Sequence, residues 1–232
     1  MGKKAPREFT VASLKREGIF YIMGLKPGPR VRFSYKAGQF VKIFLEKDSG
    51  EFEPFSIFSA PSEKELLFMF DVGSQIKSAL SQKAKGAKVY LEGPYGDFTV
   101  SKSPGHSVLI CKGLGLIPIS SIGKALIEHK KNFNIYILYE NLTRNEIVNE
   151  ARLIEFDKHK QVNILMTLLN ERPAEWPGKI GEISAPMVEE FVPSAKAKEF
   201  YVCGPPSFVN RILDLLKEMG VPESRIKSEA WG

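Results

Sequence analysis

The residues with the clearest chemical potential form a glycine-containing turn between an apolar run and a stretch with helical spacing. Residues 108–111 are apolar throughout, and the turn Gly113–Gly115 follows them. Apolar side chains then recur on one helical face over 119–126, and Pro118 stands where we expect the first helical residue, a position that needs no N–H. Glycines let a backbone approach a ligand, and a helix start attracts anions such as phosphate. The stretch is a candidate nucleotide-binding turn, although an ordinary strand-to-helix turn has the same pattern.

Composition limits the other chemistry that the chain can perform. The chain has 232 residues, a net charge of +6, two cysteines and three histidines. Two cysteines are too few for a disulfide framework, a four-cysteine zinc site or an iron–sulfur cluster, and the histidines are scattered, so we expect no metal site. No apolar run approaches the ~20 residues that cross a bilayer. The first residues lack the apolar core of a signal peptide, so we expect a cytoplasmic protein with no membrane span.

The positive charge is spread over the chain. It fits a solubilising surface or a docking face for an acidic protein partner. Nucleic acid is not an expected partner, because the basic residues are not interleaved with aromatic residues and the sequence contains no recognisable nucleic-acid-binding motif. The lysine clusters are Lys83, Lys85 and Lys88, then Lys130 and Lys131, then Lys196 and Lys198.

Two patterns of elements divide the chain into domains at 1–102 and 103–232. The first domain has short β-type segments separated by turn signals, which favours an antiparallel barrel or sandwich. One helix is expected at 75–83, with Ser74 as its N-cap. The expected strands are 8–14, 19–25, 39–45, 54–60, 65–70 and 88–92.

The second domain alternates strands with helices, which predicts a parallel sheet covered on both faces. Thr143 and Glu146 form a capping box, so we expect a helix that carries Ile147, Ala151 and Ile154. A further helix is expected to begin at Pro206 and end at Gly220, with Val209, Ile212, Leu216 and Met219 inward. The expected strands are 108–111, 135–139, 162–166 and 199–203.

Five short motifs follow one another along the chain: AGQFV at 37–41, PFSI at 54–57 with Ser59, GPYGDF at 93–98, GLGLIP at 113–118 and CGPP at 203–206. In this order they resemble one protein family, the ferredoxin–NADP reductase-like superfamily of flavin- and NAD(P)-binding oxidoreductase modules. The resemblance covers nearly the whole chain, and it implies a Greek-key antiparallel β-barrel that binds flavin, followed by an α/β parallel-sheet nucleotide-binding domain.

The resemblance implies a flavin site in the first domain, for FAD or alternatively FMN. Phe55 would pack beside the ring, and the Ser56 hydroxyl would bond near N5, since a hydroxyl can donate or accept. The flavin phosphates would lie on the loop Gly73-Ser74-Gln75. The other predicted flavin contacts are Ile57, Phe70 and Val72.

The resemblance also implies a site for NADH or NADPH in the second domain. Gly113, Leu114 and Gly115 match its nucleotide loop, and the nicotinamide would dock at Cys203, Gly204 and Pro205. Glu229 and Trp231 resemble the acidic and aromatic pair that closes the ring stack. The predicted catalytic residues are Ser56, Cys203 and Glu229. Taken singly, Phe55 also fits barrel core, Cys203 a small buried hydrophobe and Trp231 a cap on the sheet edge.

The expected reaction passes electrons from the nicotinamide through flavin to a separate iron–sulfur or haem electron-carrier protein, with the two rings meeting between the domains. Two alternatives stay open. One is a reductase-like fold that has lost flavin and acts as a non-catalytic protein-binding subunit. The other is an electron-transfer subunit of a larger hydrogenase- or dehydrogenase-type complex. The oligomeric state is not indicated.

Charged residues depart from the family pattern at three positions. Glu53 replaces an arginine that usually fixes a flavin phosphate, Asp71 stands where a basic residue is common, and Lys112 where glycine is usual. Because like charges repel, the two acids leave three outcomes open: phosphates held by Ser74 and backbone N–H groups, weakly bound flavin, or no flavin.

The choice between NADH and NADPH is also open. Asn141, Thr143 and Arg144 stand about where a 2′-phosphate would lie, whereas the neighbouring Glu140 favours a free ribose and hence NADH.

Overall fold

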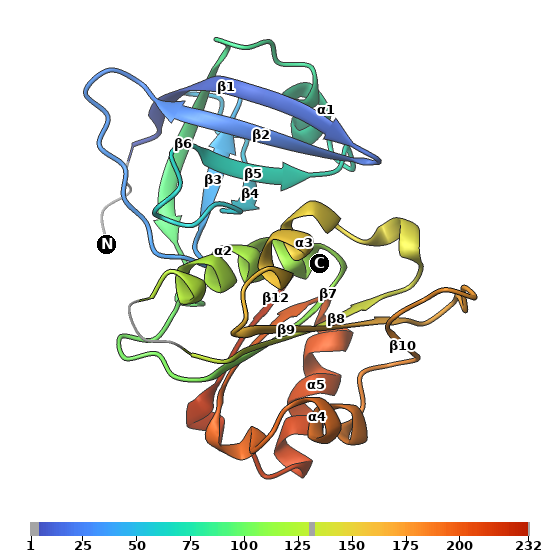
Figure 1. Cartoon of the computed structure of the whole chain (residues 1–232). Coiled ribbons are helices and arrows are strands. Elements are labelled where there is room, and N and C mark those ends of the chain that lie inside the picture. Colours follow the sequence, from blue (N-terminus) through green and yellow to red (C-terminus); the bar gives the residue numbers. More distant parts are fainter. Residues whose placement is uncertain (1–4, 130–132, 232) are drawn as a thin grey trace. The chain divides into compact units, whose positions relative to one another are not determined.

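The computed structural model describes residues 5–129 and 133–231, so Lys130 and Lys131 lie outside the described residues. It comprises two compact units, of which the first ends at Thr99 and the second begins at Val100 (Figure 1). The division lies close to the boundary expected from the composition, between 102 and 103.

The first unit is a six-stranded antiparallel sheet with the strand order β4-β3-β6-β1-β2-β5. A hydrogen bond from Phe58 N–H to the Leu67 carbonyl, at 2.9 Å, links the chain after β4 to β5, so the two edges of the sheet meet as in a barrel. The elements are β1 Arg7–Glu17, β2 Phe20–Pro27, β3 Phe40–Phe44, β4 Glu53–Ser56, β5 Leu66–Phe70, α1 Gln75–Ser81 and β6 Lys88–Tyr95.

Alternating side chains of these strands fill one apolar core, which explains why the sequence predicted them by period-two patterns. Phe9, Met23 and Val41 are examples of its buried members. Ser74 is the N-cap of α1, as predicted, because its hydroxyl accepts the Lys77 backbone N–H at 3.1 Å.

The second unit is a parallel sheet with the strand order β10-β9-β8-β7-β11-β12, so the chain winds outward from β7 in both directions. In Figure 1, α2 and α3 lie on one face of this sheet and α4 and α5 on the other. The strands are β7 Ser107–Lys112, β8 Ile135–Asn141, β9 Val162–Leu168, β10 Lys179–Ile180, β11 Glu199–Gly204 and β12 Ile226–Ala230. The α-helices are α2 Leu116–Ile127, α3 Glu150–Asp157, α4 Ala185–Phe191 and α5 Pro206–Glu218. The 3₁₀ turns are η1 Gly113–Gly115, η2 Arg144–Glu146, η3 Ala195–Ala197 and η4 Glu223–Arg225.

These two sheets confirm the predicted fold class, an antiparallel barrel followed by an α/β domain. The helix from Pro206 is also confirmed: Val209, Ile212, Leu216 and Met219 are buried, and Gly220 ends it with φ +73°. Pro118 is instead the third residue of α2, because η1 runs directly into a helix that starts at Leu116.

The predicted capping box is wrong. Thr143 precedes only the short turn η2 and makes no side-chain capping bond. The helix begins at Glu150, and Asn149 caps it: the Asn149 side chain accepts the Arg152 N–H at 2.7 Å, with the backbone at φ +44°. Ile147 therefore lies before the helix, and Ile154 is 55% exposed rather than inward.

Candidate functional site

The order of strands in the second unit marks where a ligand would bind. From β7 the chain adds β8, β9 and β10 on one side of the sheet and then β11 and β12 on the other, so the order of strands reverses between the neighbours β7 and β11. In open α/β sheets, ligands bind beyond the carboxyl ends of the strands at such a reversal. The segments at this place are η1, after β7, and Gly204-Pro205, at the end of β11.

Both glycines of η1 have a structural reason to be glycine. Gly113 adopts φ +52°, a left-handed conformation that side chains disfavour. A Cβ on Gly115 would lie 2.2 Å from the carbonyl oxygen of Cys203, so only glycine lets the turn pack against the end of β11. This contact brings two predicted site segments together, because the turn and Cys203 touch through their backbones.

Glu229 and Trp231 join the same end of the sheet. The register of β11 with β12 pairs Cys203 with Glu229 and Gly204 with Ala230. The Trp231 backbone N–H donates to the Gly204 carbonyl, and its indole N–H donates to the Glu229 carboxylate, both at 3.0 Å. The structure thus gathers the nicotinamide-site residues that were predicted from distant parts of the sequence.

Burial raises the pKa of both titratable groups at this site. Burial raises the pKa of Glu229, although the hydrogen bond from Trp231 partly opposes the rise. Burial, together with the Glu229 charge, raises the pKa of the fully buried Cys203 thiol well above its usual value. Cys203 is therefore not a thiolate nucleophile at neutral pH, and the arrangement suits the positioning of a ring rather than covalent chemistry.

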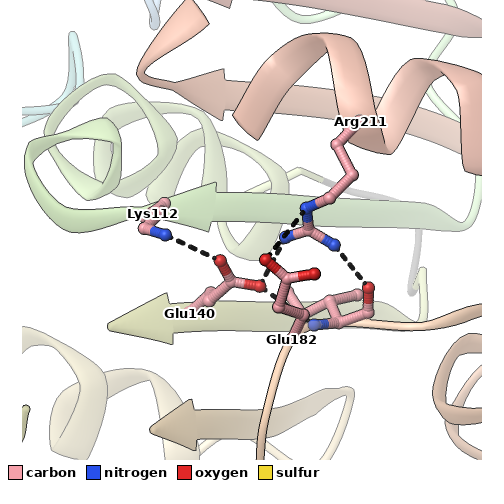
Figure 2. A network of polar contacts seen from close by, with 5 residues as sticks. Lys112, Glu140, Glu182 and Arg211 are labelled. Carbon is pink, nitrogen blue, oxygen red and sulfur yellow. Dashed lines mark hydrogen bonds and ion pairs between the residues drawn. The ribbon is translucent and has the colours of Figure 1, made fainter. Parts of the chain in front are cut away.

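Lys112 and Glu140 belong to a polar network that the sequence did not reveal (Figure 2). The Glu140 carboxylate is fully buried and lies 3.0 Å from Lys112 Nζ and 2.6 Å from Arg211 Nη2. It also accepts the Ile183 N–H at 2.9 Å, and Arg211 donates to the Ile183 carbonyl at 2.8 Å. The expectation that Glu140 favours a ribose is corrected, because its carboxylate oxygens are already bonded to protein groups.

In the first unit, the residues predicted to contact the flavin ring differ in exposure. Ser56 is half-buried at the end of β4, and Val72 is exposed. Phe55 is buried in the apolar core, with edge-on contacts to Phe68 and Phe70. The side chains of Phe55, Ile57 and Phe70 all lie inside this core, where they pack against other apolar side chains.

The loop predicted to bind the flavin phosphates is occupied by the protein's own carboxylates. The Ser74 hydroxyl donates to Glu53, and the Gly73 N–H donates to Asp71 at 3.1 Å. Lys77 Nζ lies 3.3 Å from Glu53 and 3.4 Å from Asp71. The residues present do not fit a flavin diphosphate here, because the Ser74 hydroxyl, the Gly73 N–H and Lys77 already bind carboxylates and the cluster keeps an excess negative charge.

Comparison with known proteins shows what the chain is similar to. The family described as "Oxidoreductase NAD-binding domain" matches residues 109–214. The fold matches the flavohem-like FAD/NAD-binding domain of nitric oxide dioxygenase from Vibrio cholerae at a TM-score of 0.85, with 23% identity, over 99% of this chain and 100% of that one. It also matches a ferredoxin NADP⁺ reductase from Neisseria gonorrhoeae with bound FAD and NADP at 0.80, with 17% identity, over 98% and 99%. These matches show that the chain has the fold of ferredoxin–NADP reductase-like proteins and that residues 109–214 are similar to their NAD-binding domain.

Among proteins of similar sequence, the glycine betaine monooxygenase reductase subunit of Chromohalobacter salexigens is 26% identical over 219 residues. The match covers 87% of this chain and 57% of that protein, so this chain spans little more than half of that relative's length. Among the described residues, no group of histidines, cysteines and carboxylates is placed to hold a metal ion. The described helices are all too short or too polar to cross a bilayer.

Proposed function

We propose that this chain is an NAD(P)H-dependent flavin oxidoreductase. The observation that carries the proposal is the convergence of η1, Cys203-Gly204 and the Glu229–Trp231 pair at the carboxyl end of the parallel sheet, where the strand order reverses. The match to an oxidoreductase NAD-binding domain over residues 109–214 supports it independently.

Each residue at this site has a role that follows from its surroundings. We assign the nucleotide phosphate to the turn η1 and the start of α2, because a helix start attracts anions. The Trp231 indole presents apolar surface to the nicotinamide, and Glu229 accepts hydrogen bonds from the carboxamide of that ring. The fully buried Cys203 side chain contributes by packing at the end of β11. Hydride transfer oxidises the nicotinamide at C4 and needs that carbon within ~3–3.5 Å of the acceptor atom.

A bound flavin supplies an acceptor for the hydride and can release electrons singly. On the protein side, the Ser56 hydroxyl is the group that we assign to hydrogen-bond near the flavin N5. The electrons then pass to a separate iron–sulfur or haem carrier or to a small-molecule acceptor. The relative from Chromohalobacter salexigens is named as the reductase subunit of a monooxygenase, which is consistent with a separate acceptor protein.

The test is anaerobic mixing of the purified chain and flavin with NADH and, separately, with NADPH. We expect the absorbance of the reduced nicotinamide and that of the oxidised flavin to fall together, one equivalent each. If neither absorbance falls with either nucleotide, the proposal is contradicted and the non-catalytic subunit is favoured.

The role of Trp231 has its own test. Replacing Trp231 by alanine removes the indole and its hydrogen bond to Glu229, so we expect the KM for the nicotinamide nucleotide to change by roughly threefold or more. Trp231→Phe is the matched variant, because it keeps an aromatic face but lacks the N–H. Steady-state kinetics in which both variants equal the wild type would contradict this role.

A further inference from the structure

The surroundings of the β5–α1 loop point to how this chain distinguishes among flavins. Three protein charges meet there, namely the carboxylates of Glu53 and Asp71 and the ammonium of Lys77, all on partly buried side chains. Lys77 contacts both acids, at 3.3 and 3.4 Å, so its single charge is shared between two carboxylates. A ligand phosphate placed here would meet a cluster that is already net negative.

Two hydrogen-bond donors of the loop are engaged as well. The Ser74 hydroxyl donates to Glu53 while it accepts the Lys77 N–H, and the Gly73 N–H is bonded to Asp71. A phosphate could bind these groups only by displacing a carboxylate, which would then lie close to the phosphate with its charge uncompensated.

A surface hollow of about 610 Å³ adjoins this loop. The described residues that line it are uncharged, and its polar side chains are those of Ser74, Gln75, Ser78 and Gln82. Hydroxyl and amide groups suit a polyol or an unmodified hydroxyl, whereas a diphosphate is usually held by arginine, lysine or free backbone N–H groups.

We infer that this chain recognises flavins through the ring and the neutral ribityl chain and not through phosphate, so that riboflavin, FMN and FAD bind with similar affinity and exchange freely. The inference rests on the proposed function, since it concerns the same flavin. It goes further in making the flavin an exchangeable substrate rather than a resident cofactor, with Glu53 as the residue that removes the preference for phosphate.

The first experiment titrates the full chain with riboflavin, FMN and FAD and follows the quenching of flavin fluorescence. We expect the three dissociation constants to agree within about threefold, with little dependence on salt, because no phosphate contact is made. FAD or FMN binding more than about thirtyfold tighter than riboflavin would overturn the inference while leaving the proposed function intact. Binding of none of the three would overturn both.

The second experiment changes the charge at the loop. Glu53→Gln frees the Ser74 hydroxyl and Lys77 from one carboxylate, and Glu53→Arg adds a cation. We expect the ratio of riboflavin to FMN dissociation constants to rise in both variants, by about tenfold in Glu53→Arg. Glu51→Gln and Glu51→Arg are the matched controls, because Glu51 is an exposed acid two residues away.

A ratio unchanged in both Glu53 variants, or raised equally in the Glu51 variants, would overturn the assignment to Glu53. Glu53→Gln keeps the size of the side chain and the ion pair between Lys77 and Asp71, so it tests the inference even if Glu53→Arg does not fold.

Discussion

Glu140 shows that the role of a single charged residue depends on partners from distant parts of the sequence. Its carboxylate is fully buried, and Lys112 and Arg211 balance its charge. Removing the buried carboxylate leaves two partly buried cations without their main partner, so we expect Glu140→Gln to lower the free energy of unfolding by about 3 kcal/mol. Urea denaturation measures this change.

The control for this prediction is Glu182→Gln. Glu182 contacts the same arginine at 3.8 Å, but its side chain is 59% exposed. Solvent screens such a contact, so we expect a loss below about 0.5 kcal/mol. Equal losses in the two variants would show that the buried network is not what stabilises this end of the sheet.

Gly115 gives a second prediction for a single residue. Its missing side chain lets η1 lie against Cys203, and an added Cβ would meet the Cys203 carbonyl carbon at 2.6 Å. We expect Gly115→Ala to cost about 2 kcal/mol in the free energy of unfolding, because the backbone must shift. We also expect weaker binding of NADH, measured by calorimetric titration. Gly105→Ala is the matched control, since a Cβ there meets nothing within 4 Å.

Among the elements, α3 is the one whose start the sequence predicted wrongly, and its cap can be tested directly. Asn149 has a left-handed backbone at φ +44° and accepts the Arg152 N–H. We expect Asn149→Ala to lower the free energy of unfolding by about 1–2 kcal/mol, and Asn149→Gly by less, because glycine tolerates that backbone. Thr143→Ala should have almost no effect on urea denaturation. A large effect of Thr143→Ala would support a capping role for Thr143 after all.

The elements also show what sequence alone can predict. Local signals located all six strands of the first sheet, β7, β8, β9 and β11 of the second, the Ser74 cap and the helix from Pro206 to Gly220, because apolar periodicity and special backbone residues act over a few positions. They missed β10 and β12, the two edge strands of the second sheet. The α3 start failed because two cap signals compete within seven residues. The bonds of Glu140 to Arg211 and of Ser74 to Glu53 were not predictable, because their partners are 71 and 21 residues apart in the sequence.

At the scale of the whole molecule, each unit has an apolar core of its own, so each ligand should stabilise the unit that binds it. The nicotinamide site is assigned to segments of the second unit, and the flavin ring to the end of β4 in the first. Hydrogen exchange measured by mass spectrometry can separate the two, because a ligand slows exchange only where it opposes the opening of the backbone.

NAD⁺ or NADP⁺ is added at about 100 times its dissociation constant. Some amides in 107–115 and 199–206 exchange only when the backbone opens and the ligand leaves, and we expect the exchange of these amides to slow by about a hundredfold. Amides of β1 and β2 should keep their rates. Riboflavin should instead slow exchange in 53–58, because Ser56 and its neighbours are the residues assigned to the ring. Protection of the first unit alone by the nicotinamide nucleotide would contradict the assignment of the nucleotide to β7 and β11, whatever the activity of the chain.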